Sequence, residues 1–219
     1  EAVLQGTGCG TAQWTARDGN TVEPGTALAT LECDLARMLV AERTLLNFLQ
    51  RACGIATATR AFVDAVAGTA CRILHTRKTA PGLRLLDVQA VLAGGGSRHR
   101  LSLATEVLVK DNHWHLLNRG DGGLIAACER ARQRGVNAIY VEVEDASQVC
   151  LACESGATRL LIDNQSPEQF RLLAAAARDI APNIEIEATG GMTLESARSY
   201  AEAGADFIKT STGKVAISA

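Results

Sequence analysis

A strand-to-loop junction decides the fold of this chain, and it reads His75-Thr76-Arg77-Lys78-Thr79-Ala80-Pro81-Gly82-Leu83-Arg84. The apolar residues 71–74 before it are typical of a strand, residues 80–82 interrupt regular structure, and residues 83–93 have the apolar spacing of a helix. Arg77 and Lys78 therefore stand where a strand ends and a loop begins. Because parallel α/β folds bind ligands at the carboxyl ends of their strands, this cation pair predicts an anion site.

From residue 71 onward, short β-rich segments alternate with helical ones. We expect strands at 72–75, 102–110, 138–144, 159–163, 185–188 and 206–210, and helices at 83–93, 123–134, 146–154, 167–178 and 193–203. Successive right-handed βα units favour a (β/α) barrel or a barrel-like parallel sheet. The pattern therefore predicts an α/β barrel-like catalytic domain over residues 71–219.

The first 70 residues have a different pattern. Residues 11–32 alternate polar and apolar side chains around two turns, which predicts a small β hairpin or sandwich element. Asp34 is a suitable N-cap for a helix that continues to Gly54, and a second helix is expected at 57–67. We therefore expect residues 1–70 to form a partial α+β sandwich domain with linking helices.

Composition limits the function classes. The chain has 219 residues, 47% of them hydrophobic, which is enough to bury a sizeable core. A formal net charge of −2 provides no general attraction to nucleic acid or to a membrane surface, and no apolar stretch is long enough to span a bilayer. Seven scattered cysteines, an odd number, indicate reduced thiols in a cytoplasmic protein, and the Cys150/Cys153 spacing favours a structural role because no second such pair accompanies it.

Charged side chains recur where the expected strands end. The basic ones include Arg77, Lys78, His99, Arg100 and Lys110, and the acidic ones are Glu142, Asp163 and Glu187. Arginine offers a planar fork and lysine a point charge, so a pocket with both suits a substrate that carries several anionic groups. The carboxylates could hold Mg²⁺, bind sugar hydroxyls or stabilise developing positive charge, or they could only neutralise the basic cluster.

Two glycine runs are open to more than one interpretation. Gly190-Gly191 follows an expected strand and precedes a helix near Thr193, a geometry in which backbone N–H groups can bind phosphate. A Gly-Gly step is also typical of a simple turn. Gly94-Gly95-Gly96 is compatible with a helix end or with a loop that makes room for the basic residues after it.

The order of several motifs resembles the quinolinate phosphoribosyltransferase family, also called carboxylating nicotinate-nucleotide pyrophosphorylases. The matching segments are Glu42-Arg43-Thr44-Leu45-Leu46-Asn47-Phe48-Leu49, Thr76-Arg77-Lys78-Thr79-Ala80-Pro81-Gly82-Leu83-Arg84, His99-Arg100, Val109-Lys110-Asp111-Asn112-His113, Glu142-Val143-Glu144, Asp163-Asn164 and Glu187-Ala188-Thr189-Gly190-Gly191. The resemblance implies transfer of phosphoribose from phosphoribosyl pyrophosphate to quinolinate. The products would be nicotinate mononucleotide, pyrophosphate and carbon dioxide, a step of NAD biosynthesis. It also implies Mg²⁺ as cofactor and a homodimer.

The same resemblance implies a role for each matching residue. The two quinolinate carboxylates would be held by Arg77, His99, Arg100 and Lys110, and Lys78 would lie where quinolinate meets pyrophosphate. Arg43 would reach the partner subunit's site. Glu142 and Asp163 would lie by the ribose and the metal, and the 5′-phosphate would lie by Thr189, Gly190 and Gly191. Lys78, Lys110, Glu142 and Asp163 are the expected catalytic residues.

Departures from the family pattern leave alternatives open. The family's front domain begins well before the position of Glu1, so we expect further chain upstream, and the family has Ser where Thr189 stands. Lys209 replaces another family serine, and the segment from it to Lys214 resembles the Schiff-base lysine motif of deoxyribose-phosphate aldolase. The alternatives are a Lys209 Schiff-base aldolase, a non-decarboxylating nicotinate phosphoribosyltransferase or molybdate-operon relative, and a catalytically silent binding module.

Overall fold

The structure, a computed structural model, describes residues 1–99, 106–117 and 123–209. They form two compact units, one of residues 1–60 and 78–95, the other of residues 61–77, 96–99, 106–117 and 123–209. The domain boundary expected between residues 70 and 71 stays a prediction. Arg100 and residues 210–214 lie outside the described residues, so the expected roles of Arg100 and of the aldolase-like tail beyond Lys209 stay predictions too.

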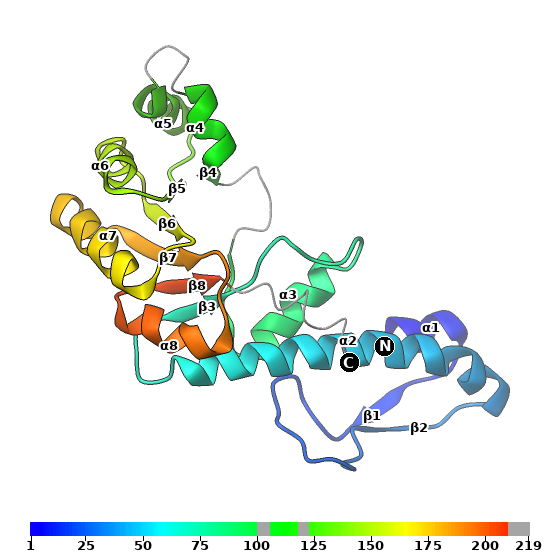
Figure 1. Ribbon diagram of the computed structural model, residues 1–219. Coiled ribbons are helices and arrows are strands. Elements are labelled where there is room, and N and C mark those ends of the chain that lie inside the picture. The colour runs from blue at the N-terminus through cyan, green and yellow to red at the C-terminus, as the bar shows by residue number, and fades with distance from the viewer. Residues whose placement is uncertain (100–105, 118–122, 210–219) are drawn as a thin grey trace. The chain divides into compact units, whose positions relative to one another are not determined.

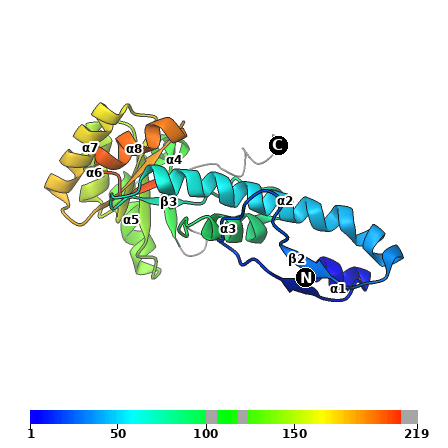
Figure 2. The ribbon, with the colours of Figure 1, turned by 90° about the horizontal axis from the view of Figure 1, so that it is seen from below.

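The first unit is a small α+β arrangement. Its strands β1 (Ala12–Trp14) and β2 (Ala29–Leu31) pair antiparallel, as the alternating pattern predicts, with Ala12 opposite Leu31. Helix α1 (Ala2–Thr7) places Leu4 in a small core with residues of this hairpin and of the long helix α2 (Leu35–Ala65). Figure 2 shows α1 beside the two strands. The apolar side chains of a short sheet are thereby covered by two helices.

Helix α2 differs from the expectation of two helices. It begins after Asp34, whose carboxylate accepts a hydrogen bond from the N–H of Ala36 at 3.0 Å, so the expected N-cap is confirmed. It then runs through Gly54 without a break. An interior glycine costs a helix only about 0.5–1 kcal/mol, and Ile55, directly after it, is fully buried against Val91 of helix α3 (Arg84–Ala93). Packing of α2 against α3 therefore outweighs the tendency of Gly54 to end a helix.

The glycine run after α3 has a packing role. A Cβ placed on Gly94 would lie 2.8 Å from Cβ of Thr59 and 3.1 Å from the backbone carbon of Ala56, both on α2. Only a residue without a side chain permits this approach, so the run ends α3 where it meets α2. This finding favours the helix-end interpretation of Gly94-Gly95-Gly96.

The second unit is built on six parallel strands in the order β3-β8-β7-β6-β5-β4. Their bounds are β3 Arg72–Leu74, β4 Val107–Val109, β5 Ile139–Val143, β6 Arg159–Asp163, β7 Glu185–Thr189 and β8 Phe207–Lys209. Each expected strand is present, and the expected parallel α/β sheet is confirmed. The described residues contain no hydrogen-bonded pair between β3 and β4, so a closed barrel stays a prediction.

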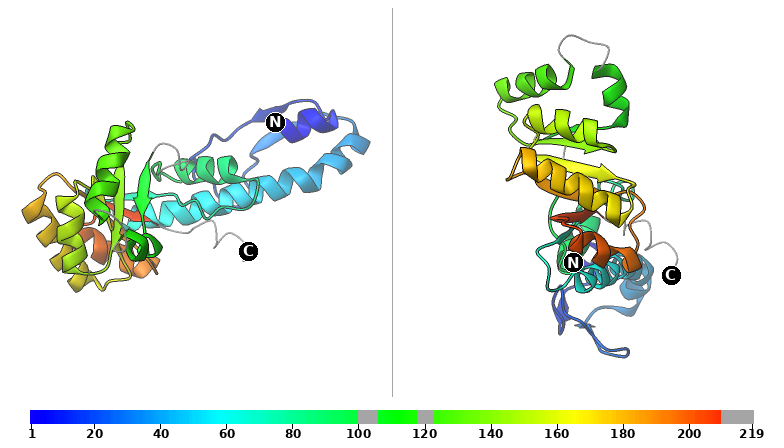
Figure 3. Two further views of the ribbon diagram at one scale, coloured as in Figure 1. Left: turned by 90° about the horizontal axis from the view of Figure 1, so that it is seen from above. Right: turned by 60° about the vertical axis from the view of Figure 1, so that its left-hand side comes forward.

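The helices of this unit cover one face of the sheet (Figures 1 and 3). They are α4 Asp111–Leu117, α5 Gly123–Gln133, α6 Ala146–Glu154, α7 Pro167–Ile180 and α8 Leu194–Glu202. From β4 to β8 each strand pairs with the next along the chain, so right-handed crossovers place the intervening helices on the same side. A single helical layer is the arrangement of a barrel wall and not of a doubly wound sheet, which explains the barrel-like character.

Side-chain alternation separates the two faces of the sheet. In β5 the residues Ile139, Val141 and Val143 belong to the core beneath the helices, whereas Tyr140 and Glu142 point to the opposite, inner face. The other strands alternate in the same way. The inner face therefore carries mostly charged and aromatic side chains that do not belong to the core beneath the helices, namely Arg72, Lys110, Tyr140, Glu142, Arg159, Asp163, Glu185, Glu187, Thr189, Phe207 and Lys209.

Within the described ranges no helix has the length and apolar character needed to cross a membrane.

Candidate active site

Three of the expected catalytic side chains lie in or directly after the last residues of neighbouring strands, at the carboxyl edge of the sheet. Lys110, after β4, places its ammonium nitrogen 2.9 Å from Oε2 of Glu142 on β5. Asp163 ends β6, the next strand of the sheet, and its pKa is raised by burial and then by the charge of Glu142, while Lys110 opposes the shift. The structure therefore brings Lys110, Glu142 and Asp163 together, as their positions at strand ends predict.

The segment after β4 supports this group. The backbone N–H of Lys110, the residue before α4, donates to Nδ1 of His113 at 2.9 Å, so the imidazole satisfies a backbone donor at the start of that helix. The indole of Trp114, buried on α4, donates to the backbone carbonyl of Glu142 at 2.8 Å. Trp114 was not expected as a site residue. Its signal in the sequence is an aromatic residue with a polar N–H directly after a strand-end motif, because such a residue needs a buried acceptor.

Glu142 and Asp163 have the chemistry that Mg²⁺ requires. Both present carboxylate oxygens, and burial, followed by the charge of Glu142, raises the pKa of Asp163; a divalent cation would relieve the second of these causes. Magnesium is commonly bound by one or two carboxylates together with substrate phosphates and water. The described part of the chain contains no cluster of three or more potential ligands. The two carboxylates therefore fit a metal that depends on the substrate for further ligands.

Directly after β7, Gly190 and Gly191 form a backbone segment without side chains, called the glycine step below. Gly190 has φ +111°, and a Cβ there would lie 2.9 Å from the backbone nitrogen of Asn164. The N–H of Asn164 itself donates to the carbonyl of Thr189 at 3.1 Å. At Gly191, by contrast, a Cβ would meet nothing within 4 Å. Since α8 begins just beyond, with Thr193 as its N-cap, this step has the backbone geometry expected of an anion cradle.

A second cluster lies on the inner face around Glu187, which is fully buried. Its Oε2 is 3.3 Å from Nε2 of His99 and 3.3 Å from a guanidinium nitrogen of Arg159, and its Oε1 is 3.2 Å from Nζ of Lys209. Burial alone would raise the pKa of Glu187, but the hydrogen bond from His99 and the charges of Lys209 and Arg159 lower it to about 2. Glu187 is therefore a permanent buried anion that gathers three basic side chains.

Arg159 was missed at the sequence level because it begins β6 instead of ending it. Its guanidinium pairs with Glu185 at 2.7 Å and stacks over the rings of Tyr140 and Phe207, 4.6 and 4.0 Å from their centroids. The guanidinium of Arg159 is thus held by an ion pair and two aromatic rings, and in this position it contacts the carboxylate of Glu187. Only the strand register reveals this role, since it places Arg159 directly beside Tyr140 and Glu185.

The remaining expected residues have different surroundings. His99 is buried, in the cluster described above, and Thr189 is partly exposed at the end of β7. Arg77 is partly exposed, and its buried Nε has no hydrogen-bond partner among the described residues. Arg43 and Lys78 are exposed residues of the first unit. Their expected roles, like those of the other site residues, stay predictions.

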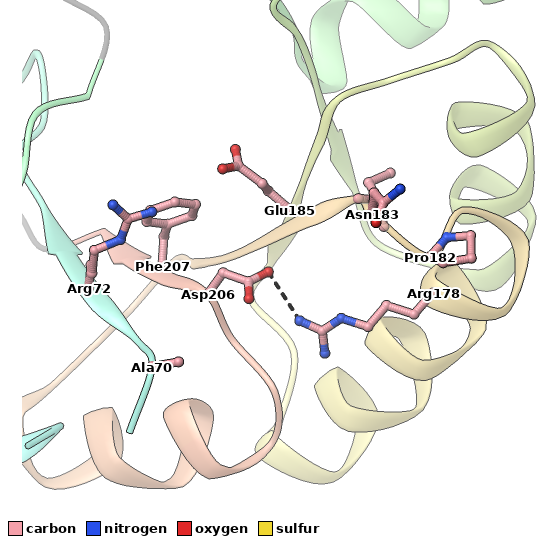
Figure 4. Close-up of a pocket in the computed structure, with 9 residues that line it drawn as sticks. Ala70, Arg72, Arg178, Pro182, Asn183, Glu185, Asp206 and Phe207 are labelled. Carbon is pink, nitrogen blue, oxygen red and sulfur yellow. Dashed lines mark hydrogen bonds and ion pairs between the residues drawn. The ribbon is translucent and has the colours of Figure 1, made fainter. Parts of the chain in front are cut away.

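The cavity drawn in Figure 4 lies at the opposite end of the strands. Its volume is about 270 Å³, and Arg72, Glu185 and Phe207, which begin β3, β7 and β8, line it. Asp206 pairs there with Arg178 at 3.1 Å and accepts a hydrogen bond from the N–H of Ile186 at 2.8 Å. In barrel folds this amino-terminal end serves stability. The cavity is therefore separate from the edge that carries Lys110, Glu142 and Asp163.

The cysteines carry no metal or redox cluster in the described residues. All seven are free; Cys153 is a buried residue of α6, and Cys150 on the same helix donates to Glu154 at 3.3 Å. Burial, followed by the charge of Asp206, raises the pKa of Cys71 to about 12, so this thiol stays protonated and unreactive. The structural interpretation of the Cys150/Cys153 spacing stays a prediction.

The fold and site together define a class: an α/β protein with a rim of cations and carboxylates at the carboxyl edge of parallel strands. Models of two parts of one family match nearly the whole chain, the quinolinate phosphoribosyl transferase N-terminal domain over residues 1–53 and the C-terminal domain over residues 55–218. The chain therefore belongs to the quinolinate phosphoribosyl transferase family.

Individual relatives agree with this assignment. A probable carboxylating nicotinate-nucleotide pyrophosphorylase of Bacillus subtilis is 39% identical over 195 residues, which cover 88% of this chain and 65% of the relative. The corresponding Mycobacterium leprae protein is 39% identical over 193 residues, covering 87% and 66%. The solved nicotinate-nucleotide pyrophosphorylase of Francisella tularensis superposes with a TM-score of 0.86 at 31% identity, over 95% of this chain and 73% of that one. The chain thus spans about two thirds of the first relatives' length.

Proposed function

We propose that this chain provides the catalytic activity of a quinolinate phosphoribosyltransferase. The reaction joins the ring nitrogen of quinolinate to C1′ of phosphoribosyl pyrophosphate and releases pyrophosphate and carbon dioxide. Its product, nicotinate mononucleotide, is a precursor in NAD biosynthesis. Membership of the family and the names of the relatives support this proposal.

One structural observation carries the proposal beyond family membership. Lys110, Glu142 and Asp163 lie together at the ends of adjacent strands, and the open Gly190-Gly191 step lies at the end of the next strand, β7. A cation, two carboxylates and a backbone cradle match the three needs of the reaction: an anionic aromatic acid, a metal-bound pyrophosphate with ribose, and a 5′-phosphate.

The substrate carboxylates need several hydrogen-bond donors. We assign them to Arg77, His99, Arg100 and Lys110, with Lys78 between quinolinate and pyrophosphate. Arg77 supports the assignment because its buried Nε has no partner among the described residues and is available to an anion. Lys110 supports it because its side chain is 48% exposed despite the ion pair with Glu142.

The chemistry begins at the sugar. As the bond from C1′ to pyrophosphate breaks, its electron pair leaves with pyrophosphate and positive charge develops on the ribose, which the carboxylates of Glu142 and Asp163 stabilise. The ring nitrogen donates its electron pair to C1′ and becomes cationic. The bond from the adjacent ring carbon to its carboxylate then breaks, carbon dioxide leaves, and the electron pair stays on that carbon until a proton arrives. Orientation of the ring by its second carboxylate supplies much of the rate.

Magnesium and the partner subunit complete the proposal. Glu142 and Asp163 would hold Mg²⁺, which supplies charge neutralisation for the departing pyrophosphate. We further propose a cytoplasmic homodimer in which Arg43 of one protomer reaches the site of the other. Arg43 is exposed on α2, as a residue acting in a partner's site must be.

The aldolase alternative has a specific observation against it. A Schiff-base lysine attacks a carbonyl with a neutral amine. The Nζ of Lys209 instead lies 3.2 Å from the fully buried Glu187 carboxylate, as the counter-ion of that carboxylate. Lys209 is therefore suited to binding anions and not to forming an imine.

A three-substrate assay tests the proposed function. Pyrophosphate release is measured with phosphoribosyl pyrophosphate and quinolinate, nicotinate or no acid, and carbon dioxide is measured in parallel. We expect release only with quinolinate, with one carbon dioxide for each pyrophosphate. Release with nicotinate alone would identify a non-decarboxylating relative, and no release with any acid would identify a silent binding module.

A further inference from the structure

Lys209 is a feature of this chain that the family's roles do not explain. It ends β8 on the inner face, opposite Leu74 of β3 in the register, and it stands where the family pattern has serine. Its side chain is only 17% exposed. A lysine in such a position must be paired, because burying an isolated ammonium group is costly. Glu187 is that partner.

Glu187 contacts both Lys209 and His99, one with each of its carboxylate oxygens. An ammonium group has three N–H donors, and the ion pair with Oε1 of Glu187 engages the group from one side. Nε2 of His99 faces Oε2 of the same carboxylate. One buried carboxylate therefore orients two basic groups.

The position of Lys209 directs it toward the end of β3. Besides burial, which is the main cause, the charges of His99 and Lys209 lower the pKa of His75, the residue that follows β3. Arg77 lies two residues further along the same segment. The aromatic ring of Tyr140 also lies near His99, with ring centroids 5.7 Å apart. Basic groups and an aromatic ring on one face suit a planar aromatic carboxylate.

We propose that Lys209 is an additional binding residue for the aromatic dicarboxylate in this chain, and that Glu187 is the positioning residue that holds Lys209 and His99 toward it. The inference rests on the proposed function, because that function supplies the ligand. It assigns to the end of β8 a cation that the family's serine does not provide. An anionic oxygen could come from a carboxylate or from a phosphate, and the proposal commits to the carboxylate.

The test measures binding directly by calorimetry, with quinolinate and with pyrophosphate as separate titrants. Lys209→Ser and Lys209→Met both remove the ammonium group, and Met keeps the aliphatic stem in case Ser disturbs the fold. A hydrogen bond to a charged group is worth about 1.5–3 kcal/mol, so quinolinate affinity should fall about 10- to 100-fold. Pyrophosphate affinity should stay unchanged. Arg171→Met, which removes an exposed charge from α7, is the control and should alter neither.

Glu187→Gln tests the positioning role. It should weaken quinolinate binding, and combining it with Lys209→Met should cost less than the sum of the two single changes, because both act on one interaction. Lys209→Arg should recover part of the affinity. Unchanged quinolinate affinity in both Lys209 variants, or loss of pyrophosphate affinity instead, would overturn the proposal. Because binding is measured without turnover, a parent chain that binds quinolinate but forms no product would contradict the proposed function alone.

Discussion

At the scale of single residues, the pKa values of two inner-face carboxylates on neighbouring strands, Asp163 and Glu187, are shifted in opposite directions. Asp163 has a raised pKa because burial and Glu142 disfavour its charge, whereas Glu187 has a lowered pKa because three basic groups outweigh its burial. The environment of Asp163 therefore favours binding of an added cation, whereas Glu187 is already paired with the basic side chains of His99, Arg159 and Lys209. The difference separates a candidate metal ligand from a structural counter-ion.

Lys110 is the residue whose removal should affect activity most directly. In Lys110→Ala the ion pair with Glu142 and the expected contact to a quinolinate carboxylate are both lost. We expect kcat/KM for quinolinate to fall about 10- to 100-fold, the effect of losing a hydrogen bond to a charged group. Steady-state kinetics measure it, with Arg171→Ala as control. Arg132 is unsuitable as a control because it donates to the carbonyl of Gly156 at 2.8 Å. Unchanged kinetics in Lys110→Ala would remove Lys110 from the site.

Glu187 predicts the acid stability of the protein. Its pKa falls from an ordinary 4.5 to about 2 on folding, so the stability that it contributes is fully present above pH 4.5 and is lost as the pH falls toward 2. The contribution is on the order of 3 kcal/mol. Urea unfolding at pH values above and below this window should show the loss in the parent chain. Glu187→Gln should be less stable at neutral pH and lack this part of the pH dependence; equal dependence in both would contradict the assignment.

At the scale of elements, caps and periodicity explain why the expected strands and helices are confirmed. Helix α7 begins at Pro167 after Ser166, whose hydroxyl accepts from the N–H of Gln169 at 3.2 Å, and α8 begins with a capping box between Thr193 and Ser196. Such signals act within four residues and can be read locally. The joining of α2 across Gly54 could not be read in this way, because contacts with α3 decide it.

The glycine step after β7 offers a matched pair of variants. Gly190→Ala should destabilise the fold by about 1–3 kcal/mol, since φ is positive and the new Cβ would press on Asn164. Gly191→Ala meets nothing within 4 Å and should leave the melting temperature unchanged. If the step binds the 5′-phosphate, Gly191→Ala should still raise the KM for phosphoribosyl pyrophosphate. Thermal unfolding and kinetics separate the two effects, and equal stability of both variants would contradict the strained geometry.

At the scale of the whole molecule, the proposed homodimer makes a prediction about mixed subunits. Arg43→Ala and Lys110→Ala should each be strongly impaired alone, because one removes a residue from the partner's site and the other from its own. In a random mixture half of the dimers are mixed and each has one intact site, so activity should recover to about a quarter of the parent's. Equal co-expression of the two chains tests this, and mixed dimers isolated through two different tags should reach about half of the parent's activity. No recovery would show that Arg43 acts within its own subunit, and full activity of Arg43→Ala alone would show that Arg43 has no role.

Apart from helix α4 (Asp111–Leu117), which was not expected, the sequence by itself determined the order and type of the elements in the parallel domain, because apolar periodicity and capping are local properties. It also indicated that Lys110, Glu142 and Asp163 would meet, since parallel strands end at one edge. Only the tertiary structure decided that His99, Arg159 and Lys209 share the carboxylate of Glu187. Those contacts depend on strand register and on which face each side chain occupies. For the same reason, the lysine that resembles an aldolase nucleophile in sequence is, in the fold, a buried cation held by its counter-ion.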